Sequence, residues 1–528
     1  MKAEIDANGM DLEQALHAAM RRGELLLDEA SRRLYAQDIY SRGPLARMVL
    51  KPDDREELAA ALTLLQADGM SVTPHGGGMS YTGGLLPADE NTAVISLDRM
   101  NRVLEINRED MTVTVECGCS WRKLHEALCE HGLRTPFWGP LSGIRATVGG
   151  SLSQNALFWG SGQYGSAADS VLSLTVVLSD GSILETGSAS QRNGSPFFRY
   201  FGPDLTGLFC ADSGALGVKA VATLRLMPEM PARAYLAFDF SSGEDTVAAM
   251  SEISRQNLAS ECFAFDPFLQ SQRLKRQGLR ADAKALAGVM KASGSILGAV
   301  RDGARVALAG RGYMDDVEWS VQVIVEDRIE AGAQARADAV RAICERLGGR
   351  EIENSIPKIT RANPFGPVNA MLGPEGERWL PIHGLLPHSR APEVLRRIEE
   401  LFARDGEKSR ALGVGMGYLF ATVSTNCFVI EPVFFWPDEW LEIHRDAVEP
   451  SHLARLPKPA ENLQAREHVA ALRRELIDLL SELGAAHTQL ARSYHYRDAL
   501  KPEAARLIDA IKNAADPAGT MNPGSLGL

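Results

Sequence analysis

The sequence has no apolar run that approaches the roughly 20 residues a membrane-spanning helix needs. Its N-terminal stretch, MKAEIDANGMDLEQALHAAM, is polar and carries acidic residues before any apolar segment, so it does not resemble a secretory signal. We therefore expect a soluble cytoplasmic protein without a membrane span. The 528 residues exceed the roughly 100–200 of a typical domain, which predicts more than one domain.

Clustered positive charge is also missing. The net charge is −12, and no block of five or six basic residues occurs. This argues against a nucleic-acid partner, because such partners are held by clustered Lys and Arg. The seven cysteines are irregularly spaced and form no C-x-x-C pair, which favours reduced thiols over a disulfide framework or a zinc site.

Two common nucleotide-binding motifs are absent. No G-x-x-x-x-G-K-[ST] occurs, which argues against a P-loop nucleotidase. No G-x-G-x-x-G follows a first strand with an acidic residue about 20 positions later, so a Rossmann-type NAD site is not supported either.

Alternating strand and helix patterns fill the first part of the chain. Residues 53–69 predict a helix, with Asp53 or Asp54 as its cap, leucines on one face and Gly69 as a left-handed stop. Residues 170–187 predict a hairpin around an Asp-Gly turn. These patterns are typical of a mixed fold.

The pattern changes near residue 232. Residues 391–404 and 466–483 carry apolar side chains at helical spacing, and the aromatic stretch 426–435 reads as a strand. We therefore interpret residues 232–490 as one α+β domain.

Glycine is concentrated in three loops. Residues 74–84, PHGGGMSYTGG, contain five glycines in eleven positions, and further small-residue runs occur at 146–165 and 211–218. Glycine lets the backbone approach a ligand closely, and successive amides can form a concave nest that holds a pyrophosphate. Three such loops within one 150-residue region suggest that they close on one extended ligand.

These loops resemble those of the vanillyl-alcohol-oxidase/p-cresol-methylhydroxylase superfamily of flavoproteins. The resemblance covers about residues 40–230 and the last dozen residues. It rests on PHGGGMSYTGG, ATVGGSLSQNA with the later QYGS, VLSDG, and DLTGLFCADSGALGVKAVATLRLMP. The tail DPAGTMNPGSLGL looks like the C-terminal signature of the hydroxy-acid dehydrogenase branch.

The resemblance implies an α+β fold with FAD as cofactor. It predicts a PCMH-type FAD-binding domain of two subdomains over residues 1–231, a substrate (cap) domain over 232–490, and a segment 491–528 that returns to the FAD domain. The residues it assigns to FAD are Pro74, His75, Gly76, Gly77, Gly78, Met79, Ser80, Gly83, Pro140, Thr147, Gly149, Gly150, Ser153, Asn155, Gly165, Gly214, Gly217, Val218 and Asn522.

Some relatives bind FAD covalently through a histidine of the first glycine loop. The linking position falls here on Met79, which cannot form the bond, and His75 lies too early in the loop. We therefore expect non-covalent FAD, with attachment through His444 or Tyr418 of the cap domain as the alternative.

The substrate chemistry requires a base near the flavin, and histidine is the usual choice because its pKa lies near working pH. His487 matches the histidine of a Glu-His-Gly motif in the hydroxy-acid branch, although Ala486 and Thr488 replace its neighbours. We expect His487 to be the base, with Arg492 and Tyr494 orienting the substrate. The metal-binding motif of that branch is absent, so no metal is expected.

The sequence thus predicts an FAD-dependent oxidase or dehydrogenase. Its donor would be the CH–OH group, or a phenolic benzylic C–H, of a small aromatic alcohol or hydroxy acid, and its acceptor oxygen or another oxidant. The alternatives are a flavin electron-transfer subunit of a multi-subunit dehydrogenase, a metal-dependent D-2-hydroxy-acid dehydrogenase and an NADPH-fed reductase. A homo-oligomer is compatible with all of these.

Overall fold

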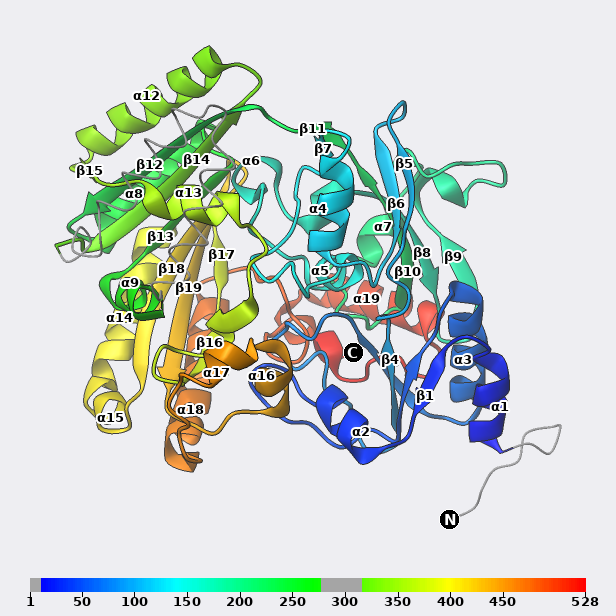
Figure 1. The fold of residues 1–528 in the computed structure, drawn as a ribbon. Helices are drawn as coiled ribbons and strands as arrows, with labels where there is room; N and C mark the ends of the chain where they lie inside the picture. The colour runs from blue at the N-terminus through cyan, green and yellow to red at the C-terminus, as the bar shows by residue number, and fades with distance from the viewer. Residues whose placement is uncertain (1–10, 277–315) are drawn as a thin grey trace.

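The structure is a computed structural model that describes residues 11–276 and 316–528 (Figure 1). Helices and strands are mixed throughout these residues, which confirms the predicted α+β class. Two small sheets built from the first half of the sequence lie on one side of the molecule. A larger sheet built from residues after 231 lies on the other side.

The first sheet has four strands in the order β1-β2-β4-β3, of which β2, β4 and β3 are parallel. Its strands are β1 (Glu24–Leu26), β2 (Met48–Lys51), β3 (Ser71–His75) and β4 (Thr92–Ser96). Helix α3 (Arg55–Ala67) precedes β3, and Asp54 caps it by accepting a hydrogen bond from the backbone N–H of Glu57 at 2.8 Å. Gly69 has φ +68°, so the predicted cap and stop of this helix are confirmed.

The second sheet has five antiparallel strands in the order β5-β6-β10-β8-β9. They are β5 (Val103–Asn107), β6 (Thr112–Glu116), β8 (Val171–Val177), β9 (Ile183–Glu185) and β10 (Val218–Arg225). Strands β8 and β9 form the predicted hairpin, and Gly181 in its turn has φ +84°. Short helices lie between its strands in the sequence: α4 (Trp121–Cys129), α5 (Val148–Gln154), α6 (Ser161–Tyr164) and α7 (Leu205–Leu208).

The large sheet has eight strands, ordered β15-β12-β14-β13-β18-β19-β16 with β17 paired to β19. They are β12 (Ala232–Phe240), β13 (Glu261–Phe265), β14 (Trp319–Asp327), β15 (Arg350–Glu351), β16 (Arg378–Pro381), β17 (Gly384–Leu386), β18 (Gly415–Val423) and β19 (Cys427–Trp436). Helices α8 (Gly243–Arg255), α12 (Glu330–Arg346), α14 (Ala391–Arg404) and α18 (Leu463–Glu482) pack against it. The helices predicted at 391–404 and 466–483 and the strand predicted at 426–435 are therefore confirmed.

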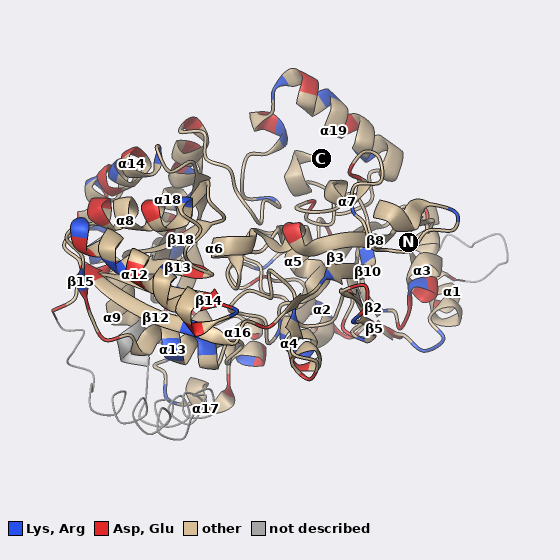
Figure 2. Ribbon diagram, turned by 90° about the horizontal axis from the view of Figure 1, so that it is seen from above, with Lys and Arg blue, Asp and Glu red and all other residues tan. Residues whose placement is uncertain are grey.

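The described residues form further α-helices and strands outside these three sheets and their packed helices. They are α1 (Leu12–Ala19), α2 (Glu29–Tyr35), β7 (Leu133–Arg134), β11 (Met227–Pro228), α9 (Pro267–Arg276), α13 (Ser355–Ala362), α15 (Gly406–Ala411), α16 (Glu442–Ala447), α17 (Pro450–Leu453) and α19 (Pro502–Ala515). Figure 2 shows acidic and basic positions interspersed along outer helices such as α14 and α19. No helix within residues 11–276 and 316–528 combines the length and apolar character needed to cross a bilayer.

Strand β19 separates two environments. The side chains of Phe428, Ile430 and Phe434 belong to the core between the sheet and its helices. Val429 and Glu431 alternate with them and face the opposite side, toward the first half of the chain. The large sheet thus has one face for the core and one face for a cavity.

The C-terminal tail lies against the first sheet, as Figure 1 shows for the red segment beside the blue strands. The backbone N–H of Val72 donates to the carbonyl of Thr520 at 2.8 Å, and that of Asn522 donates back to Val72 at 2.7 Å. Lys512 of α19 donates to the carbonyl oxygens of Ala215 and Met521. These contacts join the end of the chain to β3 and to the third glycine-rich loop.

Candidate functional site

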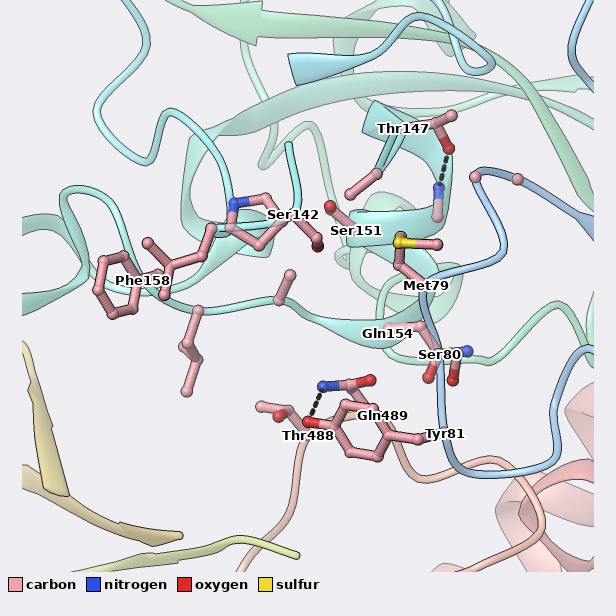
Figure 3. A pocket seen from close by; sticks show the side chains of 18 of the residues that line it. Met79, Ser80, Tyr81, Ser142, Thr147, Ser151, Gln154, Phe158, Thr488 and Gln489 are labelled. Carbon is pink, nitrogen blue, oxygen red and sulfur yellow. Dashed lines mark hydrogen bonds between the residues drawn. The ribbon is translucent and has the colours of Figure 1, made fainter. Parts of the chain in front are cut away.

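A cavity of about 660 Å³ lies where the glycine-rich loops meet the large sheet. The loops form one wall, and the free face of β13, β18 and β19 forms another. Figure 3 shows Met79, Ser80 and Tyr81 facing α5 and the segment that carries Thr488 and Gln489. The volume is within the range of about 300–1,000 Å³ that is usual for small-molecule sites.

The first loop begins where β3 ends, at His75. The backbone N–H groups of Gly76, Gly77, Gly78, Met79 and Ser80 donate to no acceptor among the described residues, and all five residues line the cavity. Unpartnered amides in a partly buried loop require a ligand or water, and consecutive ones form a nest that binds an anion. The loop therefore fits a pyrophosphate.

The glycines of this loop also let it touch the second loop. A Cβ atom on Gly77 would overlap the carbonyl oxygen of Arg145, and one on Gly76 would lie 2.6 Å from Thr147 Oγ1. Neither position has room for a side chain, so the backbone of the first loop packs directly against the start of the second loop. Gly78 has φ +73°, a conformation that favours glycine.

The second loop leads into α5. Thr147 caps this helix by accepting a hydrogen bond from the Gly150 N–H at 3.1 Å (Figure 3). A Cβ atom on Gly149 would lie 2.6 Å from Cys117 Cβ, so α5 can approach the second sheet only with glycine at that position. The helix ends at Asn155, which has φ +50°.

The third loop contains two successive residues with positive φ, Ser213 at +50° and Gly214 at +74°. Gly214 packs against the ring of Pro74, which brings the third loop onto the first. Lys219 lines the cavity, but its Nζ lies 2.6 Å from Asp212 Oδ1 in a buried ion pair. The positive charge of Lys219 is therefore already neutralised.

Most of the residues predicted to bind FAD line this cavity. They are Pro74, His75, Gly76, Gly77, Gly78, Met79, Ser80, Pro140, Thr147, Gly149, Gly150, Ser153, Gly214, Gly217 and Val218. Gly83, Asn155, Gly165 and Asn522 do not line it. Fully buried Asn522 instead connects loops, because its Nδ2 donates to the carbonyls of Gly84 at 3.0 Å and Ser213 at 2.7 Å.

The alternative covalent attachment points lie away from the cavity. Both ring nitrogens of His444 are engaged, Nδ1 with the Leu441 N–H and Nε2 with the Ile39 carbonyl, each at 3.0 Å. Tyr418 points into the core on the helix side of the large sheet. His75 does line the cavity, with its Nδ1 2.8 Å from the Gly76 carbonyl oxygen.

Two of the three predicted catalytic residues lie together beside the cavity. The ring of His487 stacks on Tyr494 at 4.1 Å, and His487 Nδ1 donates to the His383 carbonyl at 2.8 Å. The Tyr494 hydroxyl accepts a hydrogen bond from the His383 backbone N–H at 3.0 Å. Neither His487 nor Tyr494 lines the cavity, whereas His383 does.

His383 is held as a neutral ring. Its Nε2 lies 2.9 Å from the Thr488 carbonyl oxygen and 2.8 Å from the Thr488 hydroxyl. Burial, reinforced by His487, lowers the pKa of His383 to about 3. A histidine that is buried, neutral and hydrogen-bonded in this way positions the 487–489 segment and is a poor proton acceptor.

Arg492, the third predicted catalytic residue, is used within the protein. Its guanidinium donates to the carbonyls of Leu86 at 2.7 Å and Pro523 at 2.9 Å and to Asn522 Oδ1 at 3.1 Å. It does not line the cavity. The expectation that Arg492 orients substrate therefore receives no geometric support, because its donors are occupied by the tail and the first loop.

Two carboxyl groups that the sequence did not single out do line the cavity. Glu431 projects from β19, and its carboxyl group makes no hydrogen bond to any described residue; burial raises its pKa to about 7. Glu261 projects from β13 and accepts a hydrogen bond from the Gly160 N–H at 2.7 Å. Burial, with Glu326 nearby, raises the pKa of Glu261 to about 7. The available signal was that Glu431 is the one charged residue in the apolar stretch NCFVIEPVFF.

Tyr81 and Gln489 add further polar groups to the cavity. Gln489 Nε2 donates to the Tyr81 hydroxyl at 2.7 Å (Figure 3). Trp379 also lines the cavity and packs edge-on against Tyr81 at 5.9 Å. Within the described ranges, no group of three or more His, Cys, Asp or Glu side chains is arranged to hold a metal ion.

Comparison with known proteins agrees with this reading of the loops. Residues 46–187 match the model of an FAD binding domain. D-lactate dehydrogenase of Archaeoglobus fulgidus is 33% identical over 212 residues, which is 40% of this chain and 45% of that protein. The glycolate oxidase subunit GlcD of Bacillus subtilis is 26% identical over 403 residues, 73% of this chain and 82% of that one.

Among solved structures, p-cresol methylhydroxylase with substrate bound superposes with a TM-score of 0.72 at 14% identity, over 98% of this chain and 96% of that one. At this identity the likeness shows the fold alone, and it confirms the PCMH-type architecture. The chain spans 35 to 51% of the length of the first curated relatives that it matches.

Proposed function

We propose that this chain, whose FAD-binding domain belongs to the vanillyl-alcohol-oxidase/p-cresol-methylhydroxylase superfamily, is an oxidoreductase that takes a hydride from a hydroxyl-bearing carbon of a small molecule. In this proposal, residues 1–231 and 491–528 hold FAD, and residues 232–490 hold the substrate. Oxygen or another oxidant would then reoxidise the cofactor.

The observation that carries this proposal is the shared cavity. One of its walls consists of the three glycine-rich loops, and another is the free face of the large sheet. A ligand held by the loops and a ligand held by the sheet would therefore meet in one cavity, as hydride transfer requires.

The first loop would hold the pyrophosphate of FAD through the free amides of Gly76 to Ser80. The second and third loops would line the rest of the cofactor with Thr147, Gly150 and Gly214. Bound FAD supplies the acceptor for the hydride, and the protein supplies orientation and the removal of a proton.

The substrate side of the cavity is mainly apolar, with Phe263, Leu419, Val429 and Val433 among its lining residues. Such walls exclude water from the reacting carbon. The cluster of His383, Thr488, His487 and Tyr494 would act as a support that fixes the 487–489 segment beside the cavity. His487 is thus proposed as a positioning residue, because it does not reach the cavity.

We further propose that FAD is bound without a covalent link. Met79 occupies the loop position that carries the linking histidine in some relatives. His444 and Tyr418 do not line the cavity, so neither supports attachment from the sheet side. The proposal is tested by precipitating the purified protein with acid and recording the absorption spectrum of the supernatant.

Flavin absorption in the supernatant supports non-covalent FAD, whereas colour in the pellet contradicts it. Anaerobic mixing of the native protein with a panel of hydroxyl-bearing compounds then tests the activity. Bleaching of the flavin absorption by a member of the panel supports the proposed function. Bleaching by NADPH alone would instead identify a reductase.

A second candidate function is an electron-transferring subunit of a larger dehydrogenase. The similarity to a glycolate oxidase subunit over 82% of its length favours this candidate. Turnover of substrate by the isolated chain with an artificial acceptor would exclude it, and co-purification with an iron–sulfur partner would support it.

A further inference from the structure

The charges around the cavity are unusual for a protein that resembles hydroxy-acid dehydrogenases. A carboxylate substrate needs a free cation, most often arginine, to bind it. No arginine of the described residues lines the cavity, and the one lining lysine, Lys219, is paired with Asp212 at 2.6 Å. Of the two lining histidines, burial lowers the pKa of His75 and lowers that of His383 to about 3, so both are neutral.

Acidic groups, in contrast, do line the cavity. Glu431 lies on β19 between Val429 and Val433 on the cavity face, and Leu419 of β18 is directly opposite it in the sheet. Its carboxylate therefore stands alone in an apolar wall. The carboxylate has no ion-pair or hydrogen-bond partner in residues 11–276 and 316–528, so its oxygens are open to a ligand in the cavity.

We propose, building on the proposed function, that Glu431 is the catalytic residue that accepts the substrate hydroxyl proton and that its carboxylate restricts the site to uncharged alcohols. In the reaction, the O–H proton passes to a carboxylate oxygen of Glu431 while the C–H bond breaks with its electron pair, which leaves as hydride to oxidised FAD. The products are a carbonyl compound, a neutral Glu431 carboxyl group and reduced cofactor.

The environment of Glu431 suits this role. Burial in the apolar wall raises its pKa to about 7, which is close to working pH and optimal for proton acceptance. Two tyrosines lie near enough to interact electrostatically with Glu431: Tyr81 of the first loop, which lines the cavity, and Tyr494, which lies outside it; burial raises the pKa of each. His383 lines the same cavity as a neutral ring. None of these groups carries a positive charge that would offset the negative charge of a carboxylate substrate beside Glu431.

The first test measures binding and requires no turnover. Benzamide and benzoate have the same shape and differ in charge, and neither can be oxidised. Each is titrated into the FAD-loaded protein, and the shift in flavin absorption reports binding. We expect benzamide to bind at least about tenfold more tightly than benzoate, because like charges repel in an apolar cavity.

The variant Glu431→Gln removes the charge and keeps the shape, so it should reduce this preference to less than about threefold. Glu399→Gln is the control, because it makes the same change of charge on α14, on the helix side of the sheet and outside the cavity. This control should keep the preference of the native protein. Equal or tighter binding of benzoate, an unchanged preference in Glu431→Gln, or no response to either compound would overturn the proposal.

The second test separates this proposal from the proposed function. Anaerobic flavin bleaching is compared between benzyl alcohol and (R)-mandelate, which carries an added carboxylate at the reacting carbon. Bleaching by the neutral alcohol, slowed at least about 100-fold in Glu431→Gln, supports the role of Glu431 as base. Faster bleaching by mandelate overturns that role and leaves the oxidoreductase function intact. No bleaching by any hydroxyl compound contradicts the oxidoreductase function, while the benzamide titration still reports on Glu431.

Discussion

Asn522 provides the sharpest test of how the C-terminal tail serves the site. The resemblance assigns Asn522 to the cofactor, whereas the structure places its side chain fully buried between two loops and away from the cavity. Its Nδ2 donates to the Gly84 and Ser213 carbonyls, and its Oδ1 accepts from Arg492. The two readings predict different effects of Asn522→Ala.

The magnitude follows from these three hydrogen bonds. Asn522→Ala leaves two buried carbonyl groups without their donor and one guanidinium N–H without its acceptor. Each unsatisfied buried group costs about 1–3 kcal/mol, and partial relaxation reduces the sum, so we expect a loss of about 3 kcal/mol in the free energy of unfolding. This loss should occur in the FAD-free protein, because no cofactor contact is involved.

The assay is denaturant unfolding of FAD-free and FAD-loaded protein, together with a fluorescence titration of FAD. Asn91→Ala is a suitable control, because Asn91 is exposed and its substitution should change stability by no more than about 0.5 kcal/mol. If Asn522→Ala weakens FAD binding and leaves the FAD-free protein as stable as the native chain, Asn522 contacts the cofactor and the reasoning is refuted.

Three further substitutions test other parts of the structure. Gly77→Ala should weaken FAD binding at least about tenfold in a flavin fluorescence titration, because its Cβ would overlap the Arg145 carbonyl. Gly406→Ala should bind FAD normally, because its Cβ would lie at an ordinary contact distance of 3.4 Å from Arg410 Nη1. Lys512→Met removes three buried hydrogen bonds and should lower the unfolding free energy by about 3 kcal/mol; an unchanged denaturation midpoint would contradict this. Burial lowers the pKa of His444 from 6.5 to about 3. Below about pH 6.5 the unfolded chain is therefore protonated at His444 while the folded chain is not. The free energy of unfolding should then fall as the pH is lowered, by up to about 1.4 kcal/mol per pH unit. His444→Gln should show a smaller pH dependence of thermal unfolding.

The fold was predictable where a local pattern decides the structure. The helix at 53–69 carries its own cap and stop, and the hairpin at 170–187 carries its own turn. Strand order was not predictable, because the pairing of β10 with both β6 and β8 depends on contacts between residues about 40 to 110 positions apart. The boundaries at 231 and 490 stay a prediction.

The glycine-rich wall of the cavity was predictable for a similar reason. Glycine-rich loops expose backbone amide groups to the cavity. The glycines that allow this can be recognised directly in the sequence. The predicted set of lining residues was less accurate where adjacent residues differ in whether they reach the cavity. Gly83 lies outside the cavity while Gly84 lines it, and Asn155 turns away at the end of α5 while Ser153 lines the cavity.

The wall formed by the large sheet was less predictable, because its lining depends on which face of the sheet each side chain occupies. Histidine is the usual candidate for a base, because its ordinary pKa lies near neutrality. Burial lowers the pKa of His383 far below neutrality, and His487 does not line the cavity. A single glutamate is not an obvious candidate in the sequence, because its ordinary pKa lies far below neutrality. Burial on the cavity face of β19 raises the pKa of Glu431 to about 7, which is close to the ordinary pKa of a histidine. In this cavity, a carboxyl group without partners is therefore better suited to accept a proton than a buried, hydrogen-bonded histidine.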